Sequence, residues 1–255
     1  MAFVHAGGHR LEVEKIDAGG RDRPTLVLLH EGLGSIAMWR DFPHRLAHAT
    51  ASRVVAYSRY GYGNSDPLAG ARGVRYMHDE ATIVLPELLD TLGIDRPVLV
   101  GHSDGASIAL IHAGAGRRGV AAVVAMAPHV IVEDVSVASI AAARDAYRTT
   151  ALRERLARYH ADVDGVFRGW NDIWLAPEFR AWNIEEYLPR IACPVLAIQG
   201  EDDEYGTMDQ LARIARGARD VELVELSDCR HSPHRDQPEA VLDAIARFVD
   251  RVTPA

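Results

Sequence analysis

Six short apolar runs constrain the fold of this chain more than any other feature. They are rich in β-branched residues and lie at residues 25–30, 53–58, 97–101, 120–127, 194–200 and 221–226. Because their apolarity is nearly continuous, they are typical of strands buried on both faces, as in a parallel sheet. Residues 2–17 alternate loosely around Gly7 and Gly8 and predict an N-terminal hairpin.

Segments with helical spacing separate these runs, for example residues 75–93, 103–116 and 237–252. The alternation predicts right-handed crossovers and an α/β fold with a doubly wound, mostly parallel sheet. Residues 134–189 break the rhythm, because they are helix-forming and then aromatic-rich with no strand candidate. We therefore expect a core of residues 1–133 and 190–255 with a helical cap inserted at 134–189, near the sheet edge where such folds bind ligands.

Composition narrows the class of protein. The chain has 255 residues, 48% of them hydrophobic, which is enough to bury a large core. Its formal net charge of −8, without a run of five like charges, argues against nucleic acid or an anionic membrane as a partner. No stretch resembles a signal peptide or a membrane span, so a cytoplasmic protein is expected. Cys193 and Cys229 are too few for a disulfide framework and are expected to be reduced.

Ser103 lies in GHSDG (101–105), at the junction of a predicted strand and a predicted helix. The pattern G-x-S-x-G in this context holds a serine on a tight, strained turn. A serine hydroxyl is a weak nucleophile at neutral pH, so it requires a histidine base and an orienting carboxylate, in the chain order Ser, Asp or Glu, His. The acidic residues of GEDDEYG (200–206) follow one predicted strand, and His231 follows the next.

Taken together, these motifs resemble the α/β-hydrolase fold family over nearly the whole chain. The resemblance rests on LLHEGLGS (28–35), SRYGYGNSD (58–66), GHSDG, GEDDEYG and CRHSPHRDQP (229–238). It implies that Ser103 is the nucleophile and that His231 is the general base and later the general acid. The family's carboxylate most often lies three residues after the glycine that ends its strand, which implies Asp203, with Asp202 as the alternative.

The implied reaction is hydrolysis of a carboxylic ester or lactone through an acyl-enzyme, and a macrocyclic ester such as a macrolide is one candidate substrate. The oxyanion hole would be formed by the backbone N–H of Asp104 and that of Gly32 or Leu33. No cofactor is expected, because the GxGxxG pattern at 114–119 follows a predicted helix where the dinucleotide fingerprint follows a strand. No metal is expected either, since the two histidines at 231 and 234 lack a third ligand at a suitable spacing.

Two acidic residues depart from what the resemblance explains. Glu31 stands where the family usually carries a small residue, and its side chain either contacts a substrate group or turns to solvent or to Arg59. Asp104 follows the nucleophile and either faces a cationic substrate or, the favoured alternative, caps its own helix.

A small-molecule substrate pocket is expected between the cap and the loops at the strand ends, and the oligomeric state is left open. The tryptophans of the cap either line this pocket or anchor the cap to the core. The candidate lining residues are Glu31, Tyr60, Met126, His129, Trp170, Trp174 and Tyr205.

Members of the same family catalyse other reactions, some of which this sequence disfavours. Haloalkane dehalogenases and epoxide hydrolases carry aspartate where Ser103 stands and are disfavoured. Hydrolases that cleave carbon–carbon bonds of ring-fission products keep the serine, but usually have a tryptophan soon after the catalytic histidine, where this chain has Ser232, Pro233 and His234. Perhydrolases and haloperoxidases use the same triad and stay open. A non-catalytic small-molecule receptor is a further alternative, against which the intact triad argues.

Overall fold

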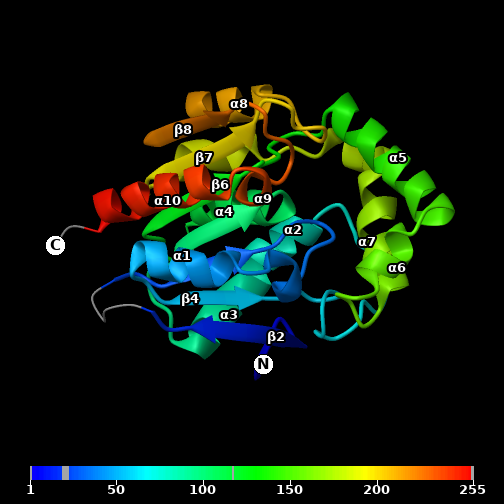
Figure 1. Cartoon of the computed structure of the whole chain (residues 1–255), viewed down its shortest axis with the longest axis horizontal. Helices are drawn as coiled ribbons and strands as arrows, with labels where there is room; N and C mark the ends of the chain where they lie inside the picture. The colour runs from blue at the N-terminus through cyan, green and yellow to red at the C-terminus, as the bar shows by residue number, and fades with distance from the viewer. Residues whose placement is uncertain (1, 19–22, 117, 254–255) are drawn as a thin grey trace.

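A computed structural model describes residues 2–18, 23–116 and 118–253 of the chain. In this part of the chain, eight strands form one sheet in the order β1-β2-β4-β3-β5-β6-β7-β8 (Figure 1). The strands are β1 Ala2–Ala6, β2 His9–Ile16, β3 Leu26–Leu29, β4 Val54–Tyr57, β5 Val98–His102, β6 Ala122–Met126, β7 Val195–Gly200 and β8 Val221–Leu226.

The sheet is mostly parallel, as predicted. β1 and β2 form the antiparallel N-terminal hairpin, with Gly7 and Gly8 in the left-handed region at φ +60° and +76°. β2 is also antiparallel to β4, and every later pairing in the sheet is parallel. Each of the six apolar runs contains one of the strands β3 to β8, so the doubly wound α/β fold is confirmed.

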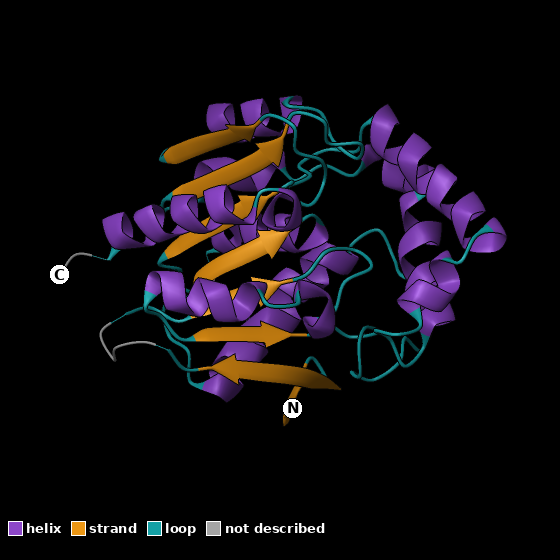
Figure 2. Ribbon diagram, viewed as in Figure 1, coloured by secondary structure: helices purple, strands orange, loops and turns teal. Residues whose placement is uncertain are grey.

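Helices cover both faces of the sheet (Figure 2). Helices α1 (Phe42–Thr50) and α10 (Pro238–Val252) pack against one face, after the short 3-10 turn η1 (Ile36–Trp39) and the short helix α9 (Pro233–Asp236) respectively. The other face carries α4 (Asp104–Ala115), α8 (Asp209–Gly217) and residues 76–92. That last segment is divided into α2 (Tyr76–Asp79), the π-helical turn η2 (Glu80–Val84) and α3 (Leu85–Leu92). The π-helical turn gives way to α3 next to Pro86, which lacks the N–H that a continuous helix would use.

The edge strand β8 departs from the expectation of strands buried on both faces. Of its six residues only Leu226 is buried, the others are partly or fully exposed, and Leu223 is 38% exposed. The reason is its place at the end of the sheet, where the helices cover it less completely than they cover β5 or β6.

Residues 134–189 connect β6 to β7, and their three helices α5, α6 and α7 lie beyond the carboxyl ends of the parallel strands (Figure 2). They form α5 (Asp134–Thr149), α6 (Leu152–Leu156), α7 (Val163–Trp174), η3 (Pro177–Ala181) and η4 (Glu185–Arg190). Helix α7 buries Val166, Phe167, Trp170, Ile173 and Trp174, which share one helical face. The last turn, η4, packs against the core, where Tyr187 lies against Gly114 and Leu188 against Gly217. In the described parts of the chain, no helix is both long and apolar enough to cross a membrane.

Candidate active site

Ser103 occupies a sharp turn between β5 and α4. Its φ of +54° lies in the left-handed region that costs a residue with a side chain energy, and its N–H donates a 2.9 Å hydrogen bond to the carbonyl of Met126. A Cβ at Gly101 would overlap the carbonyl of Gly105, and a Cβ at Gly105 would overlap that of Leu29. Both glycines of the motif are therefore required by close packing around the strained serine.

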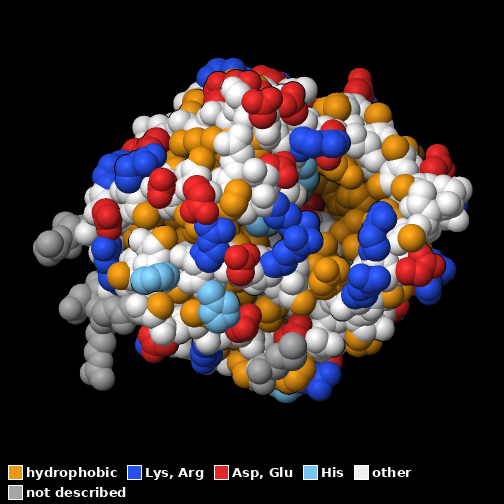
Figure 3. All heavy atoms as spheres, in the orientation of Figure 1, with side chains coloured by type: hydrophobic (Ala, Val, Ile, Leu, Met, Phe, Trp, Pro, Cys, Tyr) orange, Lys and Arg blue, Asp and Glu red, His pale blue; other side chains and the backbone are white. Residues whose placement is uncertain are grey.

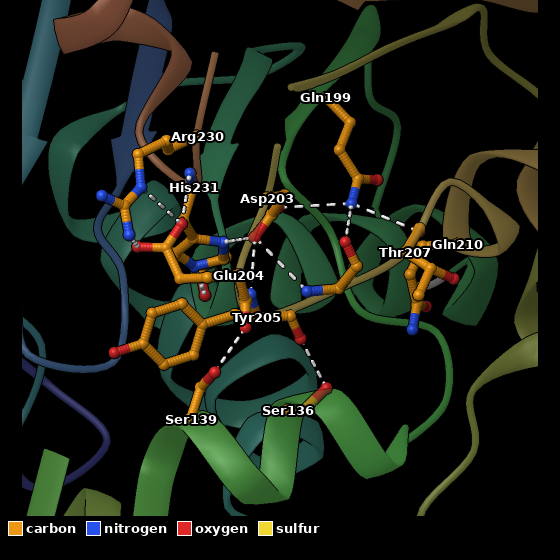
Figure 4. Close-up of polar contacts among 12 residues, drawn as sticks. Ser136, Ser139, Gln199, Asp203, Glu204, Tyr205, Thr207, Gln210, Arg230 and His231 are labelled. Carbon is orange, nitrogen blue, oxygen red and sulfur yellow. Dashed lines mark hydrogen bonds and ion pairs between the residues drawn. The ribbon is translucent and has the colours of Figure 1, made fainter. Parts of the chain in front are cut away.

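Three side chains from distant parts of the sequence meet beside this turn. His231 Nε2 lies 3.0 Å from Ser103 Oγ, and His231 Nδ1 lies 2.8 Å from Asp203 Oδ1. The Asp203 side chain is 1% exposed, whereas Asp202 is exposed to solvent. The structure thus brings together Ser103, His231 and Asp203. Of the two aspartates it aims Asp203 at the imidazole (Figure 4).

The Asp203 carboxylate is held by several donors besides His231. Oδ1 accepts the backbone N–H groups of Tyr205 (2.8 Å) and Gly206 (3.3 Å), and Oδ2 accepts the amide of Gln199 (3.2 Å). Burial by itself would raise the pKa of Asp203, but the hydrogen bond and charge of His231 and the Tyr205 N–H outweigh it and hold that pKa below its usual value. The carboxylate therefore stays ionised and fixes the imidazole orientation.

His231 is poised to accept a proton. Burial lowers the pKa of its imidazole, but the hydrogen bond and negative charge of Asp203 outweigh this, and the pKa stands above its usual value. The His231 backbone N–H donates to Glu204 Oε2 at 3.2 Å, and Glu204 pairs with Arg230 at 3.3 Å. Ring and backbone of the histidine are therefore both fixed.

Helix α5 is attached to the loop that carries Asp203. Ser136 donates to the carbonyl of Tyr205, and Ser139 donates to that of Glu204 (Figure 4). The helical segment 134–189 is thus hydrogen-bonded to the two residues that follow Asp203, one of which, Tyr205, also donates its N–H to the acid.

A cavity of about 230 Å³ lies against Ser103 and His231, between the core and residues 134–189. In Figure 3 the surface is hollowed between these two parts, and most side chains seen in the hollow are hydrophobic. The apolar lining is Leu33, Met38, Ile140, Leu152, Leu156, Trp170 and Trp174. Polar lining comes from Glu31, His102, His129, Tyr205 and Ser232.

Five of the seven predicted lining residues border this cavity, and two do not. The ring of Tyr60 stacks on His9 with centroids 3.6 Å apart, and its hydroxyl accepts the Ala69 N–H. Met126 is fully buried, because its side chain packs in the core between the sheet and the helices α1 and α10. Only its carbonyl reaches the turn of Ser103. The prediction for Tyr60 and Met126 is therefore corrected: proximity to a strand end did not specify the direction of either side chain.

The two tryptophans both line the cavity and anchor the helical segment. A Cβ at Gly32 would overlap the Trp170 indole, so this indole lies directly on the loop after β3. The Trp174 N–H donates to the hydroxyl of Tyr76 at 3.0 Å. The sequence reasoning missed the aliphatic residues of α5 and α6 in the lining, Ile140, Leu152 and Leu156, for which only helical periodicity could have served as a signal.

Both expectations for the Asp104 carboxylate are corrected. Asp104 is 1% exposed, and its Oδ2 accepts the Tyr76 hydroxyl at 2.7 Å and lies 3.6 Å from the guanidinium of Arg59. It therefore contacts neither the cavity nor the N–H groups of its own helix. A buried arginine, which the sequence alone did not reveal, accounts for this carboxylate.

The backbone of Asp104 and of the loop after β3 remains available for an oxyanion. Asp104 is the first residue of α4, so its N–H has no acceptor within the helix. Gly32 and Leu33 border the cavity on the side of Ser103. The placement of all three is compatible with the predicted oxyanion hole.

Glu31 faces the cavity with a side chain that is 18% exposed. Its Oε2 lies 3.3 Å from His102 Nδ1, and it is the backbone carbonyl of Glu31, not the carboxylate, that accepts from Arg59 at 2.9 Å. The pairing of the Glu31 side chain with Arg59 is thus wrong, and a substrate contact of Glu31 stays a prediction.

The described residues contain no group of three or more His, Cys, Asp or Glu side chains placed to hold a metal ion. Cys193 and Cys229 are both free thiols.

Comparison with known proteins places the chain in a family. The Alpha/beta hydrolase family matches residues 26–244. The chain is 36% identical over 108 residues to Epoxide hydrolase 4 of Mus musculus and 38% identical over 114 residues to a 2-hydroxy-6-oxononadienedioate/2-hydroxy-6-oxononatrienedioate hydrolase of Paraburkholderia phymatum. These matches cover 42% and 43% of this chain, but only 29% and 38% of the length of the relatives.

A solved structure of similar fold spans nearly the whole chain. The enol-lactonase from Burkholderia xenovorans superposes with a TM-score of 0.75 at 22% identity, over 97% of this chain and 99% of that one. The family match covers most of the sequence and the sheet order agrees with it, so this chain belongs to the alpha/beta hydrolase family.

Proposed function

We propose that Ser103, His231 and Asp203 form a catalytic triad that hydrolyses a carboxylic ester or lactone, with residues 134–189 as a cap over the site. The observation that carries the proposal is the hydrogen-bonded chain from Asp203 through His231 to Ser103, on a strained turn that opens into a cavity. Membership of a hydrolase family supports the general reaction.

The geometry supports a two-step acyl transfer. Ser103 Oγ attacks the carbonyl carbon while its proton passes to His231 Nε2, and Asp203 stabilises the imidazolium that results. The N–H groups of Asp104 and of Gly32 or Leu33 would receive the oxyanion, each contributing about 3 kcal/mol to the transition state. The leaving alcohol takes the proton from His231, after which a water deprotonated by His231 attacks the acyl carbon and restores Ser103.

The dimensions of the cavity favour a small substrate. Its volume of about 230 Å³ lies below the roughly 300–1,000 Å³ typical of pockets for drug-sized ligands. A macrolide would require the cap to move away from the core, so we favour a compact ester or lactone with an apolar acyl or alcohol group. The apolar wall from α5, α6 and α7 suits such a group.

Charge in the cavity argues against a dicarboxylate of the kind named for the Paraburkholderia relative. Among the described lining residues of this cavity there is a carboxylate, Glu31, and neither arginine nor lysine. A substrate with two carboxylates would meet the Glu31 carboxylate there and neither arginine nor lysine, which disfavours the ring-fission alternative. The cytoplasmic location stays a prediction.

The proposal is tested by labelling and by turnover. A fluorophosphonate should label the wild type and the control Ser227→Ala, whose serine is exposed, but not Ser103→Ala. A series of aryl esters from acetate to decanoate should be hydrolysed fastest at the short end, because the cavity closes around small groups. Equal labelling of Ser103→Ala, or no turnover of any ester or lactone by unlabelled wild-type enzyme that does react with the probe, would remove the assignment.

A further inference from the structure

His102, the residue before the nucleophile, lies between two hydrogen-bond acceptors. Its Nδ1 is 3.3 Å from Glu31 Oε2, and its Nε2 is 2.7 Å from the backbone carbonyl of His231. The His102 side chain is 1% exposed, so water does not substitute for either partner. An imidazole with one proton donates to only one acceptor, and both contacts are satisfied when both ring nitrogens carry protons.

The position of the second proton follows from the state of Glu31. Burial by itself would raise the pKa of Glu31, but the hydrogen bond and positive charge of His102 outweigh it and hold that pKa well below its usual value. Glu31 is therefore an acceptor, so His102 faces an acceptor at each ring nitrogen and satisfies both contacts only by donating from both.

We infer that Glu31 and His102 are positioning residues: a second carboxylate–histidine pair that holds the general base by its backbone carbonyl and keeps its surroundings electrically balanced. The inference rests on the proposed function, since it assigns to His231 the role of base. The pair connects three segments, the loop after β3, the end of β5 and the loop after β8, which carry the three parts of the site.

The other charges near the pair have partners of their own or lie at its edge. Arg59 is paired with Asp104, Arg230 with Glu204, and Arg235 donates to the carbonyl of Met38. The last of these still adds positive charge near Glu31.

Two buried histidines next to the site stay neutral. His234 has its ring 4.8 Å from that of His102, and burial holds its pKa well below the usual value. His129 has its ring 5.8 Å from that of His231, and burial lowers its pKa to about 3. With Asp203 fixed on His231, the charge that compensates Glu31 at short range is therefore that of His102.

A charge-balanced set of variants tests the pair. His102→Gln removes the positive charge and leaves Glu31 alone near His231, whose ring is 5.2 Å from that of His102. An uncompensated Glu31 carboxylate, whose charge acts to raise the pKa of His231, stabilises the His231 imidazolium, so the midpoint of the acidic limb should rise by about one pH unit. The double variant Glu31→Gln/His102→Gln removes both charges and should return the midpoint to the wild-type value.

The measurement is the second-order rate of fluorophosphonate labelling between pH 4 and pH 9, which needs no knowledge of the natural substrate. His112→Gln is the matched control, because His112 is also buried and bonds a backbone carbonyl, that of Ala81, away from the cavity. Its midpoint should equal that of the wild type.

Three results would overturn the inference. The first is an unshifted midpoint in His102→Gln, and the second is a double variant that keeps the shift of the single one. The third is a fall of the midpoint by half a pH unit or more in Glu31→Gln alone. In that variant His102 should lose its second proton together with its carboxylate partner, so both charges disappear and the midpoint should not change. The last variant decides the matter if His102→Gln does not fold. Absence of labelling in the wild type would refute the proposed function itself, whereas normal labelling with unshifted midpoints would refute only the pair.

Discussion

The buried contact between Asp104 and Arg59 gives a prediction whose size can be worked from the structure. Carboxylate and guanidinium lie 3.6 Å apart and both side chains are 1% exposed. Asp104→Asn keeps the shape of the side chain and can still accept the Tyr76 hydroxyl, which now bonds Oδ2 at 2.7 Å. What the substitution removes is the negative charge opposite Arg59.

Removing one partner of a buried ion pair typically costs about 3–5 kcal/mol, because the other charge is left without compensation. Two features reduce this figure here, namely the retained bond from Tyr76 and the nearby carboxyl of Glu80, which also acts on Arg59. We therefore expect the free energy of unfolding to fall by about 2–3 kcal/mol, and the melting temperature to fall by roughly 4–8 °C for a chain of this length.

Urea denaturation followed by circular dichroism measures this loss. The control is Arg59→Met alone and in combination with Asp104→Asn, because removing both charges leaves none unpaired. The double variant should lose at least about 1 kcal/mol less than the sum of the two single losses. If Asp104→Asn lowered the free energy of unfolding by less than about 1 kcal/mol, or if the losses of the two single variants simply added in the double variant, Arg59 would not be what holds this carboxylate.

Three further predictions concern the turn that carries Ser103 and the triad of Ser103, His231 and Asp203. Gly105→Ala should lose several kcal/mol of stability or fail to fold, because its Cβ would overlap the carbonyl of Leu29, as thermal unfolding would measure. Asp203→Asn should lower kcat by about four orders of magnitude while Asp202→Asn stays within about twofold, since only Asp203 bonds His231; equal effects in an ester assay would contradict the geometry. Because the pKa of His231 is raised and the base acts unprotonated, kcat/KM should decline as the pH falls through a midpoint above about 6.5, and a midpoint well below this value would be incompatible with the Asp203 contact.

The fold and the centre of the site followed from local signals in the sequence. The apolar runs marked the strands because parallel strands are covered on both faces, and the one departure, β8, lies at an edge that sequence does not reveal. The glycines around Ser103 marked the turn because close packing there tolerates no side chain. Chain order then singled out His231, and the structure aims Asp203 rather than Asp202 at its ring.

Directions of side chains were not predictable in the same way. Tyr60 and Met126 lie close to strand ends that border the site, but their side chains point elsewhere, because each packs against residues that are remote in sequence. For Asp104 the sequence favoured a helix cap over a substrate contact, and for Glu31 it left a substrate contact, solvent or Arg59 open. In the structure Asp104 pairs with a buried arginine and Glu31 bonds His102. Such contacts depend on how three loops meet in space, which no local pattern specifies.

In the proposed reaction Ser103 carries the acyl group between the two steps. Rapid quenching of wild-type protein with a short aryl ester, followed by intact-protein and peptide mass spectrometry, tests this directly. A transient mass increase equal to the acyl group is expected, located on the peptide that contains Ser103 and absent in Ser103→Ala. Steady turnover of the ester with no acylated protein, or an acyl group on any other residue, would contradict it.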